Sequence, residues 1–172
     1  MTRRRFFSPG QLSLVESATD RAEELTGDFF RLGRFGPDRY LYEVVTARHL
    51  SNRERVQGVF AHLVRYRRVE PGPLQKRRPQ QYYRICLQDQ QILDALVSKE
   101  FGLDDLLLYV MTHELIHVVR FEQFDRLFVT SKQDRLDEET MVYGLTEEIL
   151  SQVQEPGIQA MVTLYRGVRL CD

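Results

Sequence analysis

The spacing of apolar residues along the chain predicts several helices and a few strands. Apolar residues three and four positions apart indicate the buried face of a helix, whereas short runs rich in β-branched and aromatic residues indicate strands. By these criteria the predicted helices cover residues 11–25, 104–121, 137–150 and 157–166. The predicted strands cover residues 38–46 and 82–87, and residues 92–97 fit either a short helix or an extended segment. The pattern therefore favours an α+β fold.

A capping-box pattern marks the segment that starts at Ser51. Ser51 and Glu54 are spaced so that each side chain can bond to the other's backbone N–H at the start of a helix. Apolar residues with helical spacing follow, namely Val56, Val59, Phe60, Leu63 and Val64. We therefore expect a helix from residue 51 to about residue 64.

Composition and charge are those of one ordinary soluble domain. The 172 residues are 42% hydrophobic, enough to bury a sizeable core, so we expect a single domain over residues 1–172 with a flexible basic tail at residues 1–10. A formal net charge of −1 gives no overall field that would attract nucleic acid or a membrane surface. No stretch approaches the roughly 20 apolar residues of a membrane span, and we expect a cytoplasmic protein without membrane contact.

One short motif carries the clearest chemistry in the chain, the run His113-Glu114-Leu115-Ile116-His117 on the predicted helix 104–121. Histidines four apart project from one face of a helix, close enough to bind one metal ion. The glutamate after the first histidine can reach a water molecule on that ion and act as its base. The pattern therefore predicts His113 and His117 as ligands of one zinc ion per chain, and Glu114 as the catalytic base.

The alternative for this motif is a helix whose histidines are satisfied by hydrogen bonds within the core. Two of the chain's four histidines lie in the motif, and apolar residues surround it. An unpaired His-Glu-His cluster would be costly to bury in such surroundings. These observations favour a metal site.

Through the residues Thr112 to His117 and the helix that carries them, the chain resembles the zincin superfamily of metallopeptidases. The resemblance implies a zincin-like α+β fold, in which a small, mostly antiparallel sheet packs on several helices and the motif lies on a long buried helix. It also implies a third metal ligand from further along the chain. The metzincin form would need Gly and His where this chain has Arg120 and Gln123, and no histidine follows His117. What remains is similar to the gluzincin arrangement, in which a glutamate on a second helix completes the site.

Glu138 and Glu139, near the start of the predicted helix 137–150, are the candidates for this third ligand. Helical periodicity places Glu138 in line with the apolar face and would bury it more deeply. In thermolysin-like glutamate helices, however, apolar residues follow the ligand after two and six places, and Met141 and Leu145 bear this relation to Glu139. The resemblance therefore favours Glu139 and keeps Glu138 as the alternate.

A hydrolytic site of this kind also needs a donor for the oxyanion. By resemblance to gluzincins, which often use a downstream histidine or tyrosine, the candidates are Tyr143, Tyr165 and Arg166, and Tyr143 is the preferred catalytic candidate. Tyr143 follows Glu139 by four residues and could instead form a hydrogen bond that orients a metal ligand. Arg120 could orient either glutamate or form a surface salt bridge.

A second feature is a basic segment over residues 65–84, which three prolines interrupt and which we expect to be a loop from residue 65 to residue 81. Its basic residues are Arg65, Arg67, Arg68, Lys76, Arg77, Arg78 and Arg84. Interleaved tyrosines could stack on bases while the cations contact phosphates. A solvated loop, or a surface that selects an acidic partner, is the simpler interpretation.

Two functions are consistent with these features of the sequence. The first is a zinc-dependent metallohydrolase, a peptidase that cleaves a peptide or protein substrate with water activated by Glu114. The alternative is a non-catalytic module on a zincin scaffold that binds a protein or nucleic-acid partner through residues 65–84. Zinc used only for stability is disfavoured, because the sequence offers no obvious fourth protein ligand.

Overall fold

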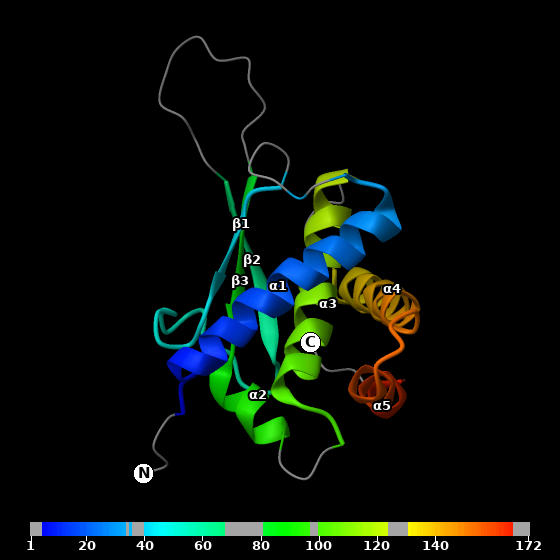
Figure 1. The fold of residues 1–172 in the computed structure, drawn as a ribbon. Helices are drawn as coiled ribbons and strands as arrows, with labels where there is room; N and C mark the ends of the chain where they lie inside the picture. Colours follow the sequence, from blue (N-terminus) through cyan, green and yellow to red (C-terminus); the bar gives the residue numbers. More distant parts are fainter. Residues whose placement is uncertain are drawn as a thin grey trace, which may run out of the picture.

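The computed structural model describes residues 5–33, 35, 40–67, 81–96, 100–123 and 131–166. Within these residues the chain forms five helices and a three-stranded sheet (Figure 1). In chain order the elements are α1 (Pro9–Phe30), β1 (Tyr42–Val45), β2 (Ala61–Arg67), β3 (Gln81–Leu87), α2 (Asp89–Ala95), α3 (Leu103–Gln123), α4 (Lys132–Leu150) and α5 (Pro156–Tyr165). The α+β class predicted from the sequence is confirmed.

The sheet has the order β1-β3-β2, so β3 lies in the middle. Strand β2 pairs antiparallel with β3, whereas β1 pairs parallel with β3. The sheet is therefore mixed, whereas a mostly antiparallel sheet was expected. The chain reverses between β1 and β2 and again before β3, which brings β3 into the sheet in the same direction as β1.

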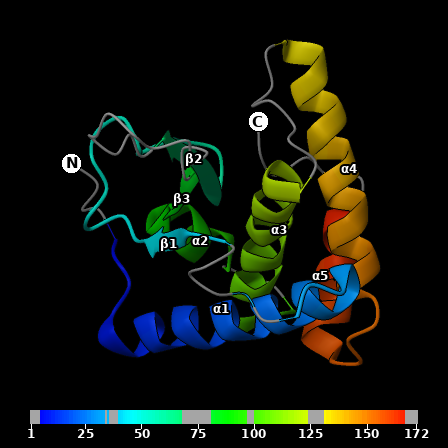
Figure 2. The same cartoon turned by 90° about the horizontal axis from the view of Figure 1, so that it is seen from above.

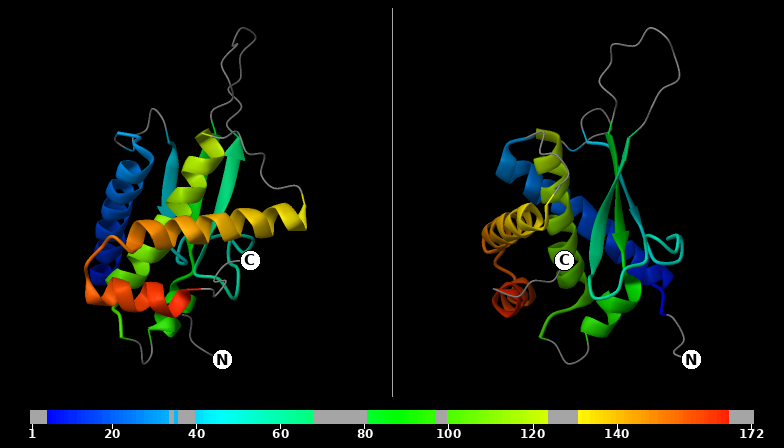
Figure 3. Two further views of the ribbon diagram at one scale, coloured as in Figure 1. Left: turned by 90° about the vertical axis from the view of Figure 1, so that its right-hand side faces the viewer. Right: turned by 180° about the vertical axis from the view of Figure 1, so that it is seen from behind.

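One face of the sheet packs against helices. Alternate residues of β3 point to this face. Tyr83, Ile85 and Leu87 on this strand are fully buried. Helices α3, α4 and α5 lie on the same side of the sheet (Figure 3), and α1 runs past both the sheet and α3 (Figure 2). The core thus forms between the sheet and a layer of helices.

Helix α3 is the central element of this layer. Every residue from Leu106 to Phe121 is buried, which fits a helix that is apolar on nearly all sides. Its neighbours include α1, α4, α5 and β2. The predicted long buried helix over residues 104–121 is confirmed, and it places the His113–His117 motif in the interior.

The helix expected from residue 51 to about residue 64 is wrong. Residues 52–54 form a turn, and Ala61–Arg67 is strand β2. Ser51 does donate its backbone N–H to Glu54 Oε2 at 2.8 Å, but this contact closes a turn and not a helix. Glu54 also accepts hydrogen bonds from Tyr66 on β2 and from Arg84 on β3, so contacts with the sheet outweigh the local signal.

Residues 1–10 were expected to form a flexible tail. This expectation is wrong for residues 5–10, the part of the segment that the structure describes. Phe7 is buried, and its N–H donates to Asp89 Oδ2 at 2.9 Å. Ser8 caps α1, which already begins at Pro9. Residues 1–4 lie outside the described residues.

The other elements differ from expectation mainly in their ends. Helix α4 begins at Lys132, where Ser131 forms a capping box with Asp134, and not at residue 137. The ambiguous segment 92–97 belongs to helix α2 up to Ala95. Among the described helices, none combines the length and the hydropathy that a membrane crossing needs.

Candidate metal centre

The two histidines of the motif project side by side from α3. His113 and His117 are one helical turn apart, and their ring centroids lie 5.0 Å from each other. The side chains are only 2% and 7% exposed. Two neutral imidazoles held in this way offer two nitrogen ligands to a single ion.

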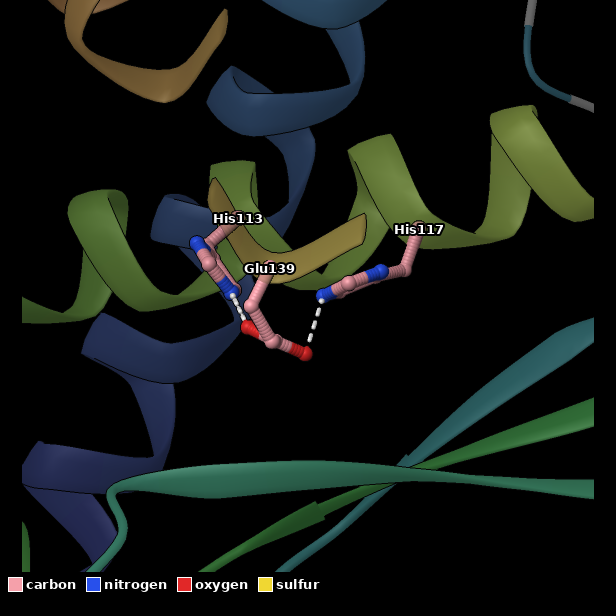
Figure 4. Close-up of side chains that lie close together, drawn as sticks. All are labelled: His113, His117 and Glu139. Carbon is pink, nitrogen blue, oxygen red and sulfur yellow. Dashed lines mark ion pairs between the residues drawn. The ribbon is translucent and has the colours of Figure 1, made fainter. Parts of the chain in front are cut away.

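Helix α4 brings a carboxylate to both rings. Glu139 Oε2 lies 3.3 Å from His113 Nε2, and Glu139 Oε1 lies 3.2 Å from His117 Nε2. The carboxylate sits between the imidazoles on the side of α3 that faces the strands (Figure 4). One ligand atom from each of the three residues lies within 4.8 Å of the others, so this group can hold a metal ion.

The neighbouring carboxylate of Glu138 is engaged elsewhere. Arg120 Nε donates to Glu138 Oε1 at 2.7 Å and a terminal nitrogen donates to Oε2 at 2.9 Å, which forms a buried bidentate pair. Glu138 is the more deeply buried of the two glutamates, as helical periodicity indicates. Its Oε1 lies 3.9 Å from His117 Nδ1, and the residue is outside the three-residue group.

The charges in this group are close to those that a metal ion needs. Burial lowers the pKa of His113, which favours the neutral imidazole. Burial alone would raise the pKa of Glu139, but the adjacent imidazoles outweigh it and lower the pKa to about 2. Burial would lower the pKa of His117, but Glu139 reverses this and raises it. A metal ion would compete with a proton for His117, so the affinity for the ion would fall as the pH falls.

If a metal ion belongs at this group, some of its polar atoms should lack a good hydrogen bond when no ion is bound. Among the described residues, His113 Nε2 and Glu139 Oε2 are buried and form no hydrogen bond of good geometry, although they lie 3.3 Å from each other. Leaving such atoms unpaired is costly, and a cation between them would satisfy both. Two imidazoles and one carboxylate are also a known donor set of catalytic zinc sites, which leave one position open. The residues present therefore fit a zinc ion.

Glu114 lies on α3 directly after the first histidine and is only 3% exposed. Burial raises the pKa of Glu114 to about 7, near the value at which a general base works best at neutral pH. The charge of Glu114 also acts on His117, so the carboxylate lies near the three-residue group.

Of the three candidate oxyanion donors, only Tyr143 is adjacent to the group. The Tyr143 ring lies 4.6 Å from the His113 ring, centroid to centroid. Tyr165 instead packs among aromatic residues, with Phe101 and Tyr109 at ring distances of 6.0 and 5.8 Å. Arg166 pairs with Glu147 at the surface.

The basic segment 65–84 is described only at its two ends, in β2 and β3, and residues 68–80 lie outside the described residues. The loop expected over residues 65–81 is wrong at both ends, because β2 extends to Arg67 and β3 begins at Gln81. Arg84 is bound by two carboxylates, Glu43 and Glu54, so its charge is compensated.

Two residues that contact the histidines were not predicted from the sequence. Thr146 Oγ1 lies 3.4 Å from His113 Nδ1, and the Phe121 ring stacks on His117 with centroids 5.7 Å apart. Their spacing in the sequence could have indicated these contacts. Thr146 follows Glu139 by seven residues, and Phe121 follows His117 by four. Both intervals return to the same face of a helix.

No family model, curated protein or solved structure matches this chain. The resemblance to zincins therefore rests on the motif and its helix alone.

Proposed function

We propose that this protein is a zinc-dependent hydrolase that cleaves peptide bonds in a peptide or protein substrate. The observation that carries the proposal is the three-residue group of His113, His117 and Glu139, two nitrogen donors and one carboxylate from two helices around one point. The burial of Glu114 beside this group adds the base that hydrolysis requires.

Each residue has a distinct task in the proposed reaction. His113, His117 and Glu139 hold the zinc ion, which would supply a water of lowered pKa and polarise the substrate carbonyl. Glu114 accepts the proton of the attacking water and returns it to the leaving amine. Burial raises the pKa of Glu114, which makes this carboxylate a stronger base than an exposed one.

The decisive variant is Glu114→Gln, which keeps the size of the side chain and removes its basicity. Zinc content and cleavage of denatured casein and of a fluorogenic peptide library are measured on the same zinc-loaded samples. We expect the parent to hold about one zinc ion and to cleave, and the variant to hold the same zinc and lose at least about 100-fold in kcat.

The matched control is Glu122→Gln, on the same helix but outside the three-residue group and not fully buried. This variant is expected to retain both zinc and activity. A parent that holds no zinc or cleaves neither substrate, or a Glu114→Gln variant as active as the parent, contradicts the proposal.

A further inference from the structure

Thr146 joins the third-ligand helix to the first histidine. It lies on α4, two turns after Glu139, and is completely buried. Its hydroxyl oxygen lies 2.7 Å from the carbonyl oxygen of Val142 and 3.4 Å from His113 Nδ1. One helix therefore presents a carboxylate to Nε2 of His113 and a hydroxyl to Nδ1 of the same ring.

The positions of the protons follow from these two contacts. A threonine hydroxyl has one hydrogen to donate and lone pairs to accept with. The carbonyl of Val142 can only accept, so it takes the hydroxyl hydrogen at the shorter distance. The oxygen can then only accept from His113 Nδ1. Without an ion, Glu139 Oε2 lies 3.3 Å from Nε2 and competes for the ring proton. Once a zinc ion takes the Nε2 lone pair, the proton is on Nδ1 and Thr146 accepts it.

We propose that Thr146 is a positioning residue that holds His113 in the Nδ1–H tautomer and so presents its Nε2 lone pair to the zinc ion. This inference rests on the proposed function, because it assigns the ion to Nε2. His117 is supported differently, with Glu138 3.9 Å from its Nδ1 and Phe121 stacked on its ring. Loss of Thr146 therefore affects one ligand and not both.

The first test compares zinc affinity among three variants by competition with a fluorescent zinc chelator. Thr146→Val keeps the shape and removes the acceptor, and it is expected to weaken zinc binding about 10- to 100-fold. Thr146→Ser restores the hydroxyl and is expected to bind nearly as tightly as the parent.

Thr140→Val is the matched control. Thr140 is exposed on the same helix and makes the same kind of hydroxyl bond to a carbonyl four residues back, at 2.7 Å. Its removal costs the helix an equivalent bond without touching His113, so zinc affinity should not change. Equal affinities for Thr146→Val and the parent would overturn the inference.

The second test reads the state of the ring directly from long-range ¹H–¹⁵N spectra of the zinc-loaded parent. Zinc is expected at Nε2 of His113 and a proton at Nδ1, and the reverse assignment would overturn the inference even if Thr146→Val fails to fold. A parent that binds no zinc would contradict the proposed function, whereas a parent that binds zinc through Nδ1 of His113 would contradict only this inference.

Discussion

Two adjacent carboxylates of α4, Glu138 and Glu139, have different environments and different tasks. Glu138 forms a buried bidentate pair with Arg120, whereas Glu139 faces two imidazoles. Burial alone would disfavour both charges, and each carboxylate faces partners of its own. The site therefore depends on two separate buried charge clusters.

The Arg120–Glu138 pair predicts a large loss of stability when one partner is removed. Arg120→Met should lower the free energy of unfolding by about 3–5 kcal/mol, because it leaves the Glu138 charge buried without its guanidinium. The matched control is Arg166→Met, which breaks an exposed pair with Glu147 and should cost less than about 1 kcal/mol. Urea unfolding measures both, and equal losses would contradict this account of the buried pair.

Glu54 predicts a pH-dependent contribution to stability. Hydrogen bonds from Ser51, and then the Arg84 guanidinium, lower the pKa of Glu54 to about 2, from an ordinary value of 4.5. The folded state therefore binds this proton less readily than the unfolded state, so the stabilisation is complete above about pH 4.5 and is lost as the pH falls towards 2.

The measurement is the unfolding free energy of the parent and of Glu54→Gln across this range. The parent should be more stable at neutral pH, and the difference should shrink between about pH 4.5 and 2. A difference that stays constant with pH would show that the carboxylate charge contributes nothing.

The residues of the site that share one helix were predictable from the sequence, whereas the contacts between helices were not. His113, Glu114 and His117 belong to one helix, so their relative placement follows from helical spacing. The choice between Glu138 and Glu139 depends on the rotation of α4 against α3. Helical periodicity indicated only the deeper burial of Glu138, and the preference for Glu139 came from the resemblance to thermolysin-like glutamate helices. Thr146 was not predicted, because its partner lies on another helix.

Helix α4 supplies the third candidate ligand, and one of its residues weakens it. Gly144 is exposed in the interior of the helix, and a methyl group added there would meet no atom within 4 Å. Glycine costs a helix interior about 1 kcal/mol relative to alanine. Gly144→Ala should therefore stabilise the protein by up to about 1 kcal/mol.

Thermal unfolding of this variant is compared with that of Gly58→Ala. Gly58 also has open space around it but has a φ of 84°, where a side chain is strained. Gly58→Ala should destabilise the protein. If both substitutions act in the same direction, backbone conformation does not control these positions.

The helices were predicted better than the strand β2. The periodicity of α3 and α5 reflects the surfaces that they bury, so the sequence indicates them directly. Residues 56–64 have helical spacing, yet they lead into β2 because this strand pairs along its length with β3. Strand pairing is a non-local interaction, and it outweighs a local pattern.

Helices α3 and α4 meet at the three-residue group of His113, His117 and Glu139. A zinc ion bound by His113, His117 and Glu139 would cross-link these two helices in the folded state only. At a free zinc concentration of about 100 times Kd, the folded state should gain about 2.7 kcal/mol. The unfolding temperature should rise with zinc and return on chelation.

The control for this prediction is His117→Ala, which removes one ligand. Its unfolding temperature should not respond to zinc. A parent whose unfolding temperature does not change with zinc, or a variant that responds equally, would contradict a metal cross-link between α3 and α4.

The topology of the sheet was the least predictable feature. Two of its three strands, β1 and β3, are recognisable from composition, but their parallel pairing depends on β3 entering between β1 and β2. Strand order of this kind depends on non-local pairing, which no local pattern indicates.

The most direct test of the metal centre is a crystal structure of the zinc-loaded protein, with anomalous scattering recorded on both sides of the zinc edge. We expect one anomalous peak per chain, bound by Nε2 of His113, a nitrogen of His117 and a carboxylate oxygen of Glu139. The absence of a peak at this position, or a peak that Glu138 binds in place of Glu139, would contradict the account.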